Sequence, residues 1–140
     1  MKRFVNYSWI LLGLLFVVVA GCSSESTGAP PPELTSNDSS RLVAVASDYV
    51  GALVAGDAEK ARTLLRSDVP EEAVNKAITT VHDQGWQFVS VSSVQPSSDG
   101  VDAVIELIDK NNQPVTRALE FKVDQGALRL WSPQLKAFSN

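Results

Sequence analysis

The order of apolar and polar positions divides the chain after residue 40 into a helical half and a strand half. Between Arg41 and Ala55 the apolar residues recur three and four positions apart, which is the spacing of one face of a helix. Similar stripes predict a second helix over 58–66 and a third that begins at Pro70. Ser39 or Ser40 is placed to cap the first helix, and glycines follow the first and third.

After Gly85 the period changes to the alternation of strands. The predicted strands cover 86–94, 101–107, 115–123 and 127–131, with turns at 95–100, 109–114 and 124–126. In the first strand, Trp86 and Phe88 are expected on one side, and Val89 and Val91 on the other. Loops this short join antiparallel neighbours. We therefore expect an α+β fold with the N-terminal helices packed on one face of a curved four-stranded antiparallel sheet.

The first 22 residues resemble the signal of a bacterial lipoprotein. Lys2 and Arg3 precede an apolar run over 9–20, and Val19-Ala20-Gly21-Cys22 is similar to a lipobox. The resemblance implies that residues 1–21 are removed and that Cys22 carries diacylglycerol and often a further acyl chain such as palmitate. The alternatives are a plain secretory signal and an uncleaved transmembrane helix, but the helix needs about 20 apolar residues.

This resemblance implies an organisation and a location. Residues 1–21 are the signal peptide, 22–40 the lipidated cysteine with a disordered tether rich in Ser and Pro, and 41–140 the α+β domain. The protein is expected outside the cytoplasm, held in the cell membrane or the outer membrane by two acyl chains. The lipid bilayer is then its first partner, through Cys22.

Charge and composition exclude several functions. The formal net charge is −4, and losing the two positive charges of Lys2 and Arg3 leaves −6. An acidic domain repels phosphates, so no nucleic-acid partner is expected. With one cysteine and one histidine, Cys-rich and His-rich metal sites are excluded, and the sequence predicts neither metal nor cofactor.

Two segments resemble domains of the nuclear-transport-factor-2-like family. The first is the helix end over 50–57 with the helix over 61–65 that follows it, and the second is the closing hairpin over 119–131. The resemblance implies a cone in which helices and a curved sheet enclose a pocket. One departure concerns the last strand, where Leu128 holds the place at which the family usually has Trp, and the tryptophan follows at Trp131.

Candidates for acid–base chemistry have simpler explanations. His82 could pair with Asp48, Asp83 or Glu106, but it lies near a predicted helix C-terminus, which favours a histidine. Glu106 and Glu120 lie on strands expected to be neighbours, but both alternate with apolar residues and belong to the solvated face. No catalytic residue is assigned.

Ligand-binding candidates are Tyr49, Arg117 and Trp131. Arg117 and Arg129 share the parity of apolar residues on their strands, so either could reach into the cone. We expect a non-catalytic role: binding a small apolar ligand or an envelope protein at the concave face of the sheet. The alternatives are a small cone-fold hydrolase or isomerase that uses Tyr49, Glu106 or His82, and strand addition at the uncharged segment 86–94. A closed, filled cone would argue against the enzyme.

Overall fold

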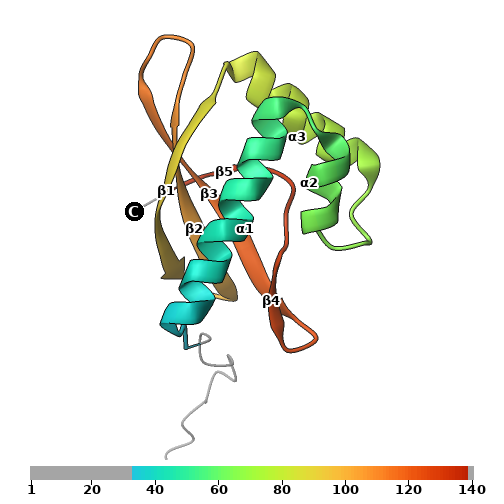
Figure 1. Cartoon of the computed structure of the whole chain (residues 1–140), viewed down its shortest axis with the longest axis vertical. Helices are drawn as coiled ribbons and strands as arrows, with labels where there is room; N and C mark the ends of the chain where they lie inside the picture. Colours follow the sequence, from blue (N-terminus) through green and yellow to red (C-terminus); the bar gives the residue numbers. More distant parts are fainter. Residues whose placement is uncertain (1–32, 139–140) are drawn as a thin grey trace, which may run out of the picture.

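The computed structural model describes residues 33–138. Its elements, in order, are α1 (Ser36–Ala55), α2 (Ala58–Leu64), α3 (Glu71–Gln84), β1 (Gln87–Pro96), β2 (Gly100–Ile108), β3 (Pro114–Asp124), β4 (Ala127–Leu130) and β5 (Lys136–Ala137). The strands form an antiparallel sheet in the order β1-β2-β3-β4, and the short β5 pairs with β3. Figure 1 shows α1 lying across the curled sheet, with α2 and α3 beside α1. The predicted α+β fold is confirmed, and β5 is an addition to the four expected strands.

The first helix begins at Ser36 rather than at Arg41, so the predicted tether and cap need correction. The Thr35 hydroxyl accepts a hydrogen bond from the Asp38 N–H, and the Asp38 carboxylate accepts one from the Thr35 N–H. This capping box pairs two backbone donors that a helix start otherwise leaves without a partner. Residues 36–40 therefore belong to the helix, and Ser39 and Ser40 lie inside it.

The other helix ends follow the sequence more closely. Gly56 and Gly85 both take the left-handed conformation that ends a helix, with φ of 73° and 63°. The Asp57 carboxylate accepts a hydrogen bond from the Lys60 N–H at 2.9 Å and caps α2. Pro70 occupies the cap position of α3 instead of its first helical position.

The edge strand β1 departs from simple alternation because it contains two register shifts, one between Phe88 and Ser90 and one between Val91 and Ser93. Each bulge adds a residue, so the side chains that pack against the core come three positions apart, at Phe88, Val91 and Val94. Val89 is 52% exposed, and the prediction that it shares a side with Val91 is wrong. Bulges also increase the local bend and twist of a strand, which fits the curl of this sheet.

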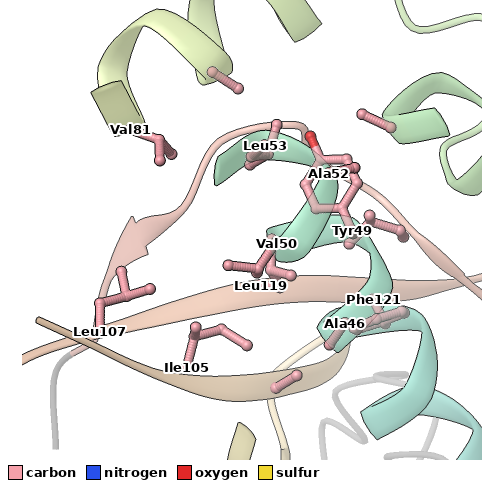
Figure 2. Packing of buried hydrophobic residues seen from close by; sticks show 14 of the residues in the cluster. Ala46, Tyr49, Val50, Ala52, Leu53, Val81, Ile105, Leu107, Leu119 and Phe121 are labelled. Carbon is pink, nitrogen blue, oxygen red and sulfur yellow. The ribbon is translucent and has the colours of Figure 1, made fainter. Parts of the chain in front are cut away.

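The core lies between α1 and the concave face of the sheet. Figure 2 shows Val50 of α1 beside Leu119 of β3 and Ala46 of α1 beside Phe121 of β3, and Ile105 of β2 belongs to the same buried cluster. The four side chains of β2 predicted to point inward are all buried, namely Val101, Ala103, Ile105 and Leu107. Among the described residues no charged side chain is buried. Apolar side chains therefore fill the space between α1 and the concave face, with a hollow of about 220 Å³ beside Leu42, Phe121 and Leu130.

The last hairpin turns at Gln125-Gly126, as the sequence predicts. Both residues have positive φ, 49° and 80°, and Asp124 pairs with Ala127 across the turn. Positive φ at both central residues is the type I′ geometry that suits a two-residue hairpin loop. The resulting register pairs Phe121 with Leu130, so the buried residue at the end of β4 is Leu130 and not Trp131.

Candidate functional site

Tyr49 lies in the centre of the core and not in an open pocket. Its side chain is fully buried, and its hydroxyl donates a hydrogen bond to the backbone oxygen of Pro133 at 2.7 Å. Burial raises the pKa of Tyr49 well above its ordinary value. The hydroxyl therefore serves to hold the segment after β4 against α1, and the structure gives Tyr49 no contact with a ligand site.

Replacing Tyr49 by phenylalanine should lower the free energy of unfolding by about 1–2 kcal/mol, because the Pro133 oxygen loses its donor. Urea denaturation measures the change. Ser47→Ala is a matched control, since the Ser47 hydroxyl bonds within α1, to the Val43 oxygen at 2.8 Å. Equal free energies for wild type and Tyr49→Phe would contradict the assigned contact.

Arg117 covers the ring of Trp86. Its guanidinium carbon lies 4.8 Å from the centre of the Trp86 ring, and Trp86 is only 7% exposed. An arginine in this position contributes a cation–π contact and a packed stem. The structure therefore assigns Arg117 to the cover of the core, and its expected role in ligand binding finds no support.

Trp131 is the candidate that lies at a surface hollow. It is 37% exposed, with the Arg66 guanidinium carbon 3.8 Å and the Lys122 ammonium 5.1 Å from its ring centre. The Arg66 guanidinium also donates two hydrogen bonds to Asp68, one at 2.9 Å, and these lower the pKa of that carboxyl. Trp131 and Arg66 are thus held in place by contacts within the protein.

A groove of about 640 Å³ surrounds this pair. It is called the Trp131 groove here and is lined by Leu65, Arg66, Ser67, Asp68, Val123, Asp124, Gln125, Arg129 and Trp131. One wall is the loop after α2, and the other is the β3–β4 hairpin. A bridge between Leu65 and Leu130 joins the two walls. The sequence indicates Trp131 and Arg129 as candidates, but it does not indicate Arg66 and Asp68, because no local pattern links these two residues to the hairpin.

The acid–base candidates are not brought together. Glu106 is exposed and lies opposite Thr116, whereas Glu120 lies opposite Asp102 and 3.3 Å from the Lys122 ammonium. Although β2 and β3 are neighbours, the two glutamates therefore do not face one another. His82 is exposed near the end of α3, with its Nε2 atom 3.1 Å from the Val54 oxygen.

The concave face was expected to bind the ligand, and this expectation needs correction. The helix α1 covers that face, and Ile105 and Leu119 beneath it are fully buried. The apolar stripe of α1 needs a partner surface, and the concave face supplies it.

Cys22 and the signal over 1–21 lie outside the described residues. Within residues 33–138, no helix combines the length and the apolar character that crossing a membrane requires. The same range contains no group of three or more His, Cys, Asp or Glu side chains arranged to hold a metal ion. No protein-family model matches this sequence, and comparisons with curated proteins and with solved structures returned no match.

Proposed function

We propose that this protein is a lipoprotein held outside the cytoplasm by acylated Cys22, and that its domain binds a small ligand or an envelope partner without catalysing a reaction. The anchor rests on the basic start, the apolar run and the Ala20-Gly21-Cys22 ending. Two acyl chains give stable attachment to a cell membrane or outer membrane without help from a basic protein surface. The acidic charge of the chain fits an anchor that is lipid rather than electrostatic.

One observation carries the binding role: the cone is packed with apolar side chains, while the groups suited to recognition gather outside it, around Trp131. A hydrolase or isomerase of this architecture would need acid–base groups that converge on a pocket. The Tyr49 hydroxyl is hydrogen-bonded to Pro133, and Glu106 and His82 are exposed on different elements. These placements favour binding over the enzyme alternative.

The proposal extends to the fold family. The helix that ends at Gly56-Asp57, the short helix after it and the curled antiparallel sheet are features that nuclear-transport-factor-2-like domains share. Such a fold hosts many unrelated functions, so the family by itself assigns no activity. The binding role is therefore argued from the groove.

A second candidate partner is an envelope protein that adds a strand to β1. This strand forms one edge of the sheet, contains no charged residue between Gln87 and Pro96, and exposes Val89 by 52%. Exposed edges with these properties are prone to pair with other chains. The two bulges limit the length over which such pairing can run.

The anchor is tested by feeding a labelled fatty acid to bacteria that express the full chain. We expect label on the wild type and its recovery with membranes, and neither for Cys22→Ser, because only the thiol can form the thioether. Ser23→Ala is the matched control and should remain labelled. A wild-type chain that stays unlabelled and in the soluble fraction would contradict the anchor.

A further inference from the structure

We propose that the hollow beside Leu42, Phe121 and Leu130, called the α1–β4 hollow here, binds the tail of a medium-chain fatty acid. This inference deepens the proposed function, on which it rests, by naming the class of small ligand. Three properties of the hollow lead to it: its apolar walls, the sign of the charged side chains that line it, and its position at the end of the domain next to the N-terminal anchor.

The walls of the α1–β4 hollow come from both helices and strands. Its apolar lining includes side chains from the first half of α1, the end of α2, β3 and β4, namely Leu42, Leu64, Phe121, Leu128 and Leu130. Leu42 and Phe121 are buried, whereas Leu64 and Leu128 are partly exposed, so the apolar surface runs from the core to the opening. The volume of about 220 Å³ has room for about seven water-sized groups, at about 30 Å³ each. Since a methylene group is similar in size, a tail of about seven carbons fills the hollow.

The charged side chains that line this hollow are both positive. Arg41 of α1 and Arg129 of β4 belong to the lining, and no aspartate or glutamate among residues 33–138 does. Within that range Arg41 has no ion-pair partner, and Arg129 has a single contact, between its Nε atom and Asp124 at 3.8 Å. Both guanidinium groups therefore keep donors for a carboxylate, which they bind strongly. Apolar walls with two arginines match the two ends of a fatty acid.

Acidic side chains near the hollow restrict where the carboxylate of the ligand can lie. Glu33 and Asp38 line an adjoining hollow, which shares Arg41 and Leu128 with the first. The Asp38 carboxylate is already hydrogen-bonded to Thr35, in the cap of α1. Repulsion from these two acids favours a position of the ligand's carboxylate on the side of Arg129, away from the adjoining hollow.

The position of the hollow favours a ligand that comes from a membrane. Figure 1 shows that α1 begins at the end of the domain where the β3–β4 hairpin turns. Glu33 lies at the same end, because it lines the adjoining hollow together with Gly126 of the hairpin. The eleven residues 22–32 span at most about 40 Å. With Cys22 acylated, this end of the domain stays near the bilayer, into which fatty acids partition.

Equilibrium dialysis of radiolabelled octanoate tests the proposal, with the full lipidated protein in phosphatidylcholine nanodiscs and empty nanodiscs as the blank. We expect the wild type to bind octanoate about tenfold more tightly than 1-octanol, which has the same tail but no charge. The double variant Arg41→Ala/Arg129→Ala should lose this tenfold preference and still bind 1-octanol, which would show that it is folded. Both arginines are exposed, so neither is needed for the core. Arg62→Ala is the matched control, since Arg62 is exposed, lies 2.9 Å from Glu71 and does not line the hollow.

The length of the tail gives a second readout. From butanoate to octanoate, the affinity should rise about fourfold for each methylene group, as expected for burial of apolar surface. From octanoate to dodecanoate it should rise little, because the hollow is then full. Uptake by the lipid of the nanodisc has no such limit, so levelling near eight carbons distinguishes the hollow from the bilayer.

Three outcomes would overturn the inference: no binding of octanoate, an unchanged affinity for octanoate in the double variant, or an affinity that keeps rising to dodecanoate at the same rate. If 1-octanol binds as tightly as octanoate, the fatty-acid inference is wrong, but a small ligand still binds and the proposed binding function stands. The anchor is decided separately, by the labelling of Cys22.

Discussion

Replacing Phe121 by alanine should lower the free energy of unfolding by about 3–5 kcal/mol. The side chain is 1% exposed and lies under α1, opposite Val101 of β2 and Leu130 of β4. Its removal takes away apolar burial and leaves a cavity between three strands and a helix, which packed surroundings cannot fully close. Chemical denaturation followed by circular dichroism measures the loss.

The matched control is Val123→Ala on the same strand. Val123 is 52% exposed, so its truncation should change the free energy of unfolding by no more than about 0.5 kcal/mol. If the two variants were equally stable, Phe121 would not be part of a packed interior.

Gly100→Ala is expected to be the other severe change. A Cβ atom at this position would lie 2.0 Å from the backbone oxygen of Phe121 on the neighbouring strand. Because a backbone group cannot rotate away as a side chain does, β2 and β3 must separate where they pair. We expect a loss of about 3 kcal/mol, at the upper end of overpacking effects.

Gly51→Ala provides a control of opposite sign. Gly51 lies inside α1 and has no atom within 4 Å of the site where its Cβ would be. Alanine there should raise the stability by about 0.5–1 kcal/mol, because it restricts the unfolded chain and favours the helix. Similar effects of the two substitutions would show that the close approach at Gly100 is wrong.

Much of this fold follows from local patterns. The helical stripe from Leu42 to Leu53 predicts one buried face of α1, and the alternation along β2 predicts one buried face of that strand. Both faces are buried in the structure. The start of α1 and the facing of side chains along β1 were predicted wrongly, because neither follows from the local pattern of apolar residues. The helix start was missed because Thr35 and Asp38 lie in a stretch whose composition resembles a tether. The bulges of β1 are set by pairing with β2, which no pattern within β1 reveals.

The candidate site was harder to predict, for a physical reason. Tyr49 has the spacing of a core residue, and its partner Pro133 is far away in the sequence, in a segment without regular structure. Trp131 stands out as an aromatic residue next to Arg129 and Leu130, but the groove also needs Arg66 from the opposite wall. That contact depends on how the loop after α2 packs on the hairpin, and therefore on tertiary structure.

The burial of Tyr49 makes the stability of the folded protein depend on pH. A tyrosine whose pKa is raised in the folded state contributes stability that is fully present below its unfolded pKa of about 10 and is lost as the pH rises above it. The folded protein should therefore lose stability above about pH 10 more steeply than Tyr49→Phe, which lacks the group.

Alkaline titration of Tyr49 shows whether its hydroxyl lies in a packed interior between α1 and the sheet. Absorbance at 295 nm follows phenolate formation, and the difference between wild type and Tyr49→Phe isolates this hydroxyl. We expect the difference to show no ionisation near pH 10 while circular dichroism still reports the folded state. Ionisation of Tyr49 near pH 10 in the folded protein would show a hydroxyl open to water, and would contradict the packed cone.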